Sequence, residues 1–431
     1  MIGASTAQGR PPGHALAGWV YGLGILACVL GACTPSTAPG SGTAAPVAPP
    51  SGSSAPASSA PVSSTPDPGS STTPPAPPSS APTPSAADPL QGWTLEQEVG
   101  QLFMVGVDVH KQQSASWAAV TDHHVGNVFI AGRSQAGQDH VLALVRSFTD
   151  LVSADTTRST PMLVATDQEG GAVQVLRGPG FSVIPSALSQ SGMTPARLES
   201  EAAGWGRELS AAGITLDLAP VMDLVDGDPA SNPPIGAWDR QYGDTADSVV
   251  AHANAFSRGM RSAGVAVAIK HFPGLGRVGA NTDTTAGVTD TVTTRDDASV
   301  GVFAEGIADG AEMVMMSTAV YRRIDPDAPA AFSPVVVGDV LRGDLGFGGV
   351  VITDDVSAAV QVQAWTPGER AVRAIDAGCD IVLVSAAPEQ AGAMVDAVVS
   401  RARQDPAFAA KVRASALRVL ALKASMPDAG G

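Results

Sequence analysis

Two stretches decide the fold of this chain: Lys270-His271-Phe272-Pro273-Gly274 and, further along, Ile352-Thr353-Asp354-Asp355. In each of them, a short apolar run ends in charged residues. A parallel β-barrel presents its reactive groups in this way, at the carboxyl ends of its strands. The two stretches therefore predict an enzyme whose site is built from strand ends.

Apolar runs with the length of buried strands recur along the chain after Trp93. There are eight of them: 102–107, 125–130, 161–167, 215–223, 265–271, 312–319, 349–354 and 380–385. Alanine-rich helical patterns lie between most of them, at 197–212, 246–263 and 369–377. Strands that alternate with helices indicate an α/β fold with a parallel sheet, and eight strands favour a single (β/α)8 TIM-type barrel over an open sheet. We assign this barrel to residues 90–431.

The first 32 residues have the pattern of a lipoprotein signal peptide. An apolar stretch over 15–30 is too short and too close to the N-terminus for a lasting membrane span. It ends in Leu30-Gly31-Ala32-Cys33, which has the small residues and the terminal cysteine of a bacterial lipobox. We expect lipid on Cys33 and anchoring at the outer face of the cell membrane. An ordinary secretory signal with an incidental cysteine is the alternative.

Residues 33–89 are rich in Ser, Pro, Ala, Thr and Gly, and this composition predicts a disordered tether because it offers almost no apolar surface to bury. The formal net charge of −16 disfavours nucleic acid as a partner. Cys28 would leave with the signal peptide, so Cys379 would be alone in the barrel. The chain therefore has no disulfide framework, and Cys379 is expected to be a buried, inert thiol.

Charged residues end four of the predicted strands. Asp167 ends the third run, Asp223 the fourth, Lys270 and His271 the fifth, and Asp354 the seventh. A single aspartate at such a place can simply cap the next helix. Because all these strand ends meet at one rim of a barrel, the set indicates a functional site. The other histidines are scattered and lack the spacing of a zinc site, so we expect no metal.

At these residues the chain resembles glycoside hydrolase family 3, and specifically its bacterial β-N-acetylglucosaminidases. The similarity runs from about residue 95 to residue 421. Its most specific motif is 270–274, and four others stand in family order: Asp167-Gln168-Glu169-Gly170-Gly171, 218–223, Asp239-Arg240 ahead of Tyr242-Gly243, and Thr353-Asp354-Asp355. The resemblance implies a (β/α)8 barrel that acts alone, and a retaining hydrolase that needs no cofactor.

The resemblance also implies roles for individual residues. Asp354 matches the nucleophile, and Asp167, Arg240, Lys270 and His271 match positions that hold the sugar hydroxyls. Positive groups beside Asp354 are expected to keep it ionised. Its neighbour Asp355 should point elsewhere, because successive side chains of a strand alternate, and serve as a cap or a hydrogen-bonding support.

The acid/base departs from the family pattern. In close relatives, the loop after Lys-His-Phe-Pro-Gly carries an Asp, a small residue and a His, and the His is the acid/base. Here the loop reads Asn281-Thr282-Asp283, and Leu275 stands where relatives often have a histidine. We predict that Asp283 transfers the proton itself, from a mobile loop and with a raised pKa. The choice between water and phosphate as acceptor stays open.

Other functions remain compatible with the sequence. Lys270 could form a Schiff base in an aldolase-like lyase. The missing histidine could mark a lipoprotein that binds cell-wall sugars without hydrolysing them, and a β-glucosidase of the same family is a third alternative. The resemblance, together with the expected export, implies terminal N-acetylglucosamine on peptidoglycan-derived saccharides or muropeptides as substrate. A single complete barrel with few aromatic residues suggests a monomer.

Overall fold

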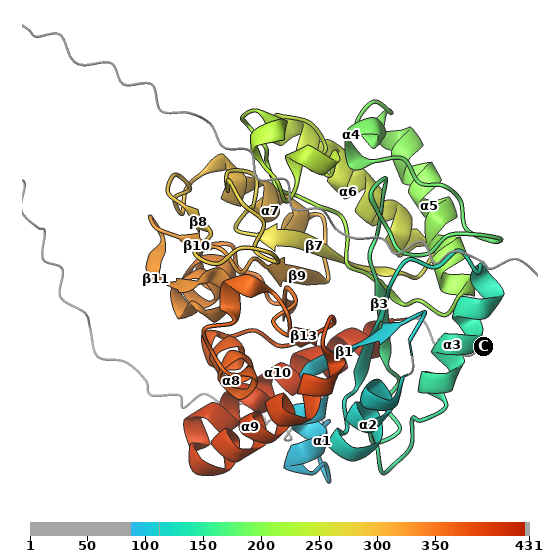
Figure 1. Cartoon of the computed structure of the whole chain (residues 1–431), viewed down its shortest axis with the longest axis vertical. Helices are drawn as coiled ribbons and strands as arrows, with labels where there is room; N and C mark the ends of the chain where they lie inside the picture. The colour runs from blue at the N-terminus through green and yellow to red at the C-terminus, as the bar shows by residue number, and fades with distance from the viewer. Residues whose placement is uncertain (1–87, 112, 427–431) are drawn as a thin grey trace, which may run out of the picture. The chain divides into compact units, whose positions relative to one another are not determined.

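The computed structural model describes residues 88–111 and 113–426, which form a parallel barrel of eight strands. In barrel order the strands are β1 (Phe103–Asp108), β2 (Asn127–Ala131), β3 (Leu163–Thr166), β6 (Leu216–Asp217), β7 (Ala266–Phe272), β9 (Met313–Met316), β12 (Val350–Thr353) and β13 (Val382–Val384). β13 pairs with β1, and a bridge between Ile352 and Ile381 joins it to β12. In Figure 1 the helices surround these strands. The predicted barrel is confirmed.

All eight predicted strands are present, although the fourth is much shorter than its apolar run. Only Leu216 and Asp217 pair regularly with both neighbouring strands. Pro220 has no N–H to donate to a ladder, so the regular pairing stops before it. Val221 then pairs with Lys270 in an isolated bridge, so the backbone stays beside β7 until it reaches Asp223 at the rim.

The predicted helices are also present, as α5 (Pro195–Ala211), α6 (Ala246–Ser262) and α8 (Pro367–Ala377). Thr366 caps α8 and forms a capping box with Glu369. The other α-helices are α1 (Leu95–Gly100), α2 (Ser114–His123), α3 (Gln138–Thr149), α4 (Ala187–Gln190), α7 (Ala298–Ala308), α9 (Ala391–Gln404) and α10 (Pro406–Ser425). Among the described helices, none combines the length and apolarity that crossing a membrane requires.

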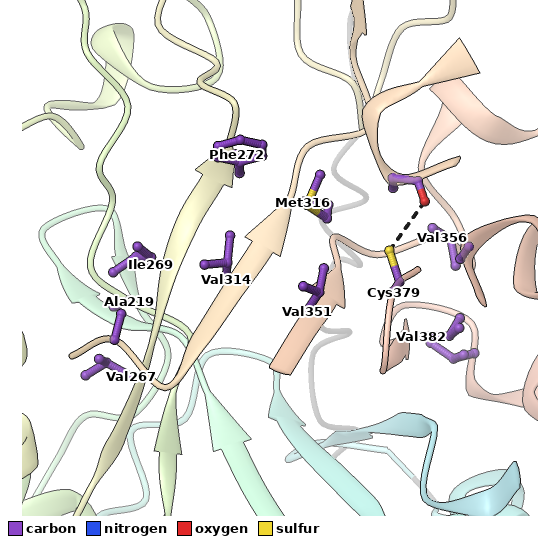
Figure 2. Packing of buried hydrophobic residues seen from close by; sticks show 14 of the residues in the cluster. Ala219, Val267, Ile269, Phe272, Val314, Met316, Val351, Val356, Cys379 and Val382 are labelled. Carbon is purple, nitrogen blue, oxygen red and sulfur yellow. Dashed lines mark hydrogen bonds between the residues drawn. The ribbon is translucent and has the colours of Figure 1, made fainter. Parts of the chain in front are cut away.

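Two apolar layers build the core. One fills the barrel with side chains such as Met104, Leu216, Met315 and Leu383. The other packs the outer face of the strands against the helices, and Figure 2 shows part of it, including residues of β7, β9 and β12. Cys379 lies in this second layer with its thiol donating to the Ala331 carbonyl, and burial raises its pKa. The prediction of a buried thiol is confirmed.

Shorter elements above the barrel shape the rim. They are the hairpin β4 (Gln168–Gly170) with β5 (Val173–Gln174), a small sheet of β8 (Thr289–Asp290), β10 (Val320–Tyr321) and β11 (Asp325–Pro329), and the 3-10 turns η1 (Pro229–Ser231), η2 (Gly236–Trp238), η3 (Ala330–Phe332), η5 (Val360–Val362) and η6 (Pro388–Gln390). The π-helix η4 (Val335–Asp344) precedes β12 and packs against η3 and α8. The predicted signal peptide, Cys33 and nearly all of the predicted tether lie outside the described residues.

Candidate active site

A cavity of about 450 Å³ opens at the carboxyl ends of the barrel strands. All six residues that the sequence assigned to catalysis or sugar binding line it: Asp167, Arg240, Lys270, His271, Asp283 and Asp354. Apolar side chains that include Phe129, Leu218, Met315 and Leu383 close the cavity toward the barrel interior. The fold therefore brings residues from five separate segments of the chain to one polar chamber with an apolar floor.

A buried charge cluster forms one wall of the cavity. The Lys270 ammonium lies 2.7 Å from Asp167 Oδ1 and 2.6 Å from Glu169 Oε1. Arg240 binds the Glu169 carboxylate with two N–H groups, Nε to Oε2 at 2.9 Å and Nη2 to Oε1 at 2.7 Å. Burial by itself would raise the pKa of Glu169, but Arg240 and Lys270 outweigh it and lower this pKa to about 2. Glu169 is thus a permanent anion that orients both cations.

The same cluster leaves hydrogen-bonding capacity for a ligand. Lys270 directs two of its three N–H donors at Asp167 and Glu169, so one donor remains for a ligand. The Lys270 contact with Asp167 is made to Oδ1, and Oδ2 of Asp167 can accept from a ligand. An acceptor beside a donor suits a sugar hydroxyl, which both donates and accepts. Burial would lower the pKa of Lys270, but Asp167 and Glu169 raise it above its ordinary value. A Schiff-base lysine needs a lowered pKa, so this environment opposes the lyase alternative.

His271 is held by Asp223, which is fully buried. The His271 Nδ1 atom lies 2.7 Å from Asp223 Oδ2, and the other carboxylate oxygen accepts from the backbone N–H groups of His271 and Leu275. Because an ionised carboxylate can only accept, Nδ1 carries the proton. The Nε2 atom is then the one available to a ligand. Asp223, which was predicted at the rim, therefore fixes the orientation of the His271 ring by hydrogen bonding.

Asp354 is half-buried at the end of β12, and its backbone N–H donates to the Met316 carbonyl of β9. Its pKa is raised to about 6: burial is the largest cause, His271 acts against it, and the nearby charge of Asp283 acts with it. Positive groups were expected to help keep this carboxylate ionised; His271 acts in that direction, but desolvation outweighs it. At neutral pH a pKa of about 6 still leaves Asp354 mostly ionised.

Asp355 also lines the cavity, and it organises the loop that follows. Its Oδ1 accepts from Ser357 N, Ser357 Oγ and Ser385 N, and its Oδ2 accepts from Ala358 N. The Asp355 N–H itself donates to Asp354 Oδ1 at 2.8 Å. The expected role as a hydrogen-bonding support agrees with these contacts.

Asp283 lies on the loop between β7 and β8, exposed at the cavity. Partial desolvation raises its pKa, and so does Asp355, while His271 and Arg240 act in the opposite direction. The loop, predicted to be mobile, is hydrogen-bonded to the segment that follows Asp354. The Val360 N–H donates to the Asp283 carbonyl at 3.2 Å, and the Gln361 N–H donates to the Thr282 carbonyl at 3.0 Å.

Glu169 is the site residue that sequence reasoning did not single out. It is 4% exposed, and it carries both cations of the sugar-binding wall. A signal was present, because Asp167 and Glu169 are two residues apart and such residues share one face of an extended chain. Among the described residues, this site included, His, Cys, Asp and Glu form no group of three or more that could hold a metal ion.

Comparisons with known proteins identify the family of this chain. Residues 94–422 match the model of the glycosyl hydrolase family 3 N-terminal domain. A β-hexosaminidase of Alkalilimnicola ehrlichii is 33% identical over 300 residues, which cover 68% of this chain and 82% of that protein. The crystal structure of a β-N-acetylhexosaminidase from Beutenbergia cavernae is 61% identical with a TM-score of 0.76, over 77% of this chain and 98% of that one. A family 3 β-N-acetylglucosaminidase from a Paenibacillus species is 33% identical with a TM-score of 0.69, over 77% and 62%. The chain therefore belongs to glycosyl hydrolase family 3.

Proposed function

We propose that this protein is a retaining exo-β-N-acetylglucosaminidase that forms a covalent glycosyl-enzyme on Asp354. One observation carries the proposal: the carboxylates of Asp354 and Asp283 line the same cavity as the charged wall of Asp167, Lys270 and Arg240. Retaining hydrolysis needs two carboxyl groups close enough to act on one glycosidic bond. The names of the similar proteins, β-hexosaminidase and β-N-acetylhexosaminidase, support the choice of sugar.

The reaction follows in two balanced steps. In the first, a carboxylate oxygen of Asp354 attacks the anomeric carbon, the bond to the leaving oxygen breaks, and the Asp283 carboxyl gives that oxygen its proton. In the second, the Asp283 carboxylate removes a proton from water, whose oxygen attacks the anomeric carbon and releases Asp354. The raised pKa of Asp283 suits both roles, because it keeps a proton available closer to neutral pH.

The charged wall would hold the sugar that is transferred. Hydrogen bonds to charged groups are strong and directional, so the acceptor Asp167 and the donor Lys270 can fix a hydroxyl pair and position the anomeric carbon at Asp354. The expected natural substrate is a peptidoglycan-derived saccharide with terminal N-acetylglucosamine, met by a monomeric lipoprotein at the outer face of the membrane. That part of the proposal rests on the lipobox at Cys33.

The primary test is the release of 4-nitrophenol from its β-N-acetylglucosaminide and its β-glucoside, with Asp354→Ala as control. We expect turnover of the acetamido sugar, and a loss of at least ~10³-fold in the control because the covalent step is removed. Preference for the glucoside would instead make the protein a β-glucosidase. No turnover of either glycoside would favour the sugar-binding lipoprotein.

The acid/base assignment has its own prediction. Asp283→Asn should lower kcat/KM by ~10²- to 10⁴-fold for N-acetylglucosaminides with poor leaving groups, because these need the proton. Aryl glycosides with acidic leaving groups need no proton, so their kcat/KM should fall less than about tenfold. Azide, which needs no general base, should accelerate the second step in the variant. Equal losses for good and poor leaving groups would contradict the assignment of Asp283.

A further inference from the structure

Gln361 links the loop of Asp283 to the segment of Asp354. Its side chain is 7% exposed, and its amide pairs with the backbone of one residue on the loop. Gln361 Oε1 accepts from the Val288 N–H at 2.8 Å, and Gln361 Nε2 donates to the Val288 carbonyl at 3.0 Å. The amide thus makes the two bonds that a neighbouring strand would make, and it satisfies both polar groups of Val288 in a buried place.

Two backbone hydrogen bonds run beside this side-chain pair. The N–H groups of Val360 and Gln361 donate to the carbonyls of Asp283 and Thr282. Together the four hydrogen bonds, which we call the Gln361 clamp, attach both Asp283 and the end of its loop to η5. The Asp283 N–H is held as well, by Asn281 Oδ1 at 2.7 Å.

The other end of the clamp is tied to the nucleophile. η5 begins six residues after Asp354. The intervening turn is fixed by Asp355, whose carboxylate accepts from Ser357 and Ala358. A short, fully hydrogen-bonded path therefore runs from Asp354 through Asp355 and η5 to Asp283. This path joins the backbone segments that carry the two carboxylates.

We infer that Gln361 is a positioning residue for the acid/base: the Gln361 clamp holds Asp283 at the distance from Asp354 that retaining hydrolysis requires. This inference rests on the proposed roles of Asp283 and Asp354. A retaining pair works at a carboxyl separation of roughly 5–5.5 Å, and a misplacement of about 1 Å can cost ~10²-fold in rate. A loop held only by its covalent connections would not keep Asp283 within about 1 Å of the required position.

The test is Gln361→Ala, with Gln363→Ala as the matched control. Gln363 lies on the same segment, and its amide donates to the carbonyls of Ser357 and Ala359 without reaching the Asp283 loop. For Gln361→Ala we expect kcat/KM to fall ~10- to 100-fold with poor leaving groups and less than threefold with activated aryl N-acetylglucosaminides. Azide should raise its kcat, as for Asp283→Asn, and Gln363→Ala should match the unmodified protein.

The outcomes separate this inference from the proposed function. If Asp283→Asn itself shows no dependence on the leaving group, the acid/base assignment fails and the inference fails with it. If Asp283→Asn shows that dependence while Gln361→Ala loses activity equally on all substrates, or loses none, only the positioning role is overturned. Should Gln361→Ala not fold, Gln361→Asn keeps the amide but shortens its reach, and it carries the same leaving-group test.

Discussion

The pKa of Asp354 sets a limit on catalysis in acid. Only the ionised carboxylate can attack the anomeric carbon, and burial raises its pKa to about 6. We therefore expect kcat/KM to be half-maximal near pH 6 and to fall about tenfold per pH unit below it. The measurement is kcat/KM against pH for an activated aryl N-acetylglucosaminide, on which proton donation by Asp283 has little influence.

Asp283→Asn serves as the control for this pH dependence. The charge of Asp283 contributes to the raised pKa of Asp354, so its removal should move the acid limb of the profile to lower pH. An acid limb that stays at the same pH in both proteins would contradict the coupling of the two carboxylates. An acid limb near pH 4 in the unmodified protein would contradict the effect of burial.

Asp217 gives a prediction about stability. Its side chain is fully buried; Oδ1 accepts from the Gln168 N–H, while Oδ2 has no hydrogen-bond partner among the described residues. Burial raises its pKa from 3.8 to about 8. Between these two pH values the folded state binds more protons than the unfolded state, so this group makes the free energy of unfolding decrease as pH rises.

Asp217→Asn should remove that dependence, because an amide does not titrate. Relative to the unmodified protein, we expect the variant to gain stability from pH 5 to pH 8, on the order of 1 kcal/mol or more. Urea unfolding at both pH values measures the gain, with Asp327→Asn, at an exposed position, as control. An equal pH dependence in the unmodified protein and the Asp217 variant would refute the prediction.

At the scale of elements, the barrel could be predicted because its strands are buried on both faces. Such strands are continuous apolar runs of four to eight residues, and all eight were visible in the sequence. The strands β8 and β10 could not be predicted, because each has only two residues and two residues show no periodicity. The π-helix η4 was also missed, because its three consecutive valines and two glycines have low helix propensity.

The site was predictable where a residue stands at a strand end, and not where its role depends on a distant partner. Asp354 and Lys270 follow directly from the barrel, because its strand ends converge. The pairing of Glu169 with Arg240 joins residues 71 positions apart, and that of Asp223 with His271 joins residues 48 apart. No local pattern encodes these contacts. The first contact forms when β4 and the segment after η2 come together at the rim, and the second forms when the chain after β6 comes to lie beside the end of β7.

At the scale of the whole molecule, the seam between β12 and β13 closes the barrel, and Asp380 anchors it. Its Oδ2 accepts from Arg342 Nη2 at 2.6 Å and from the Val351 N–H at 2.9 Å. Its Oδ1 accepts from Ser415 Oγ and Arg418 Nε of α10. Asp380 is 0% exposed, so the carboxylate fastens the last seam to both η4 and the final helix.

Asp380→Asn should therefore loosen the closure of the whole barrel. Removing one partner of a buried ion pair typically costs about 3–5 kcal/mol. Because Arg342 and Arg418 keep 20% and 32% of their side chains exposed, we place this case at the lower end, about 3 kcal/mol. We expect a loss of this size in urea unfolding, as a lower midpoint with an unchanged slope. Asp344→Asn is the control, since it breaks a comparable 2.6 Å pair with Arg295 whose side chains are 42% and 51% exposed, and it should cost less than about 1 kcal/mol. Equal effects of the two substitutions would mean that the seam does not depend on Asp380, and that the hydrogen bonds between β12 and β13 close the barrel alone.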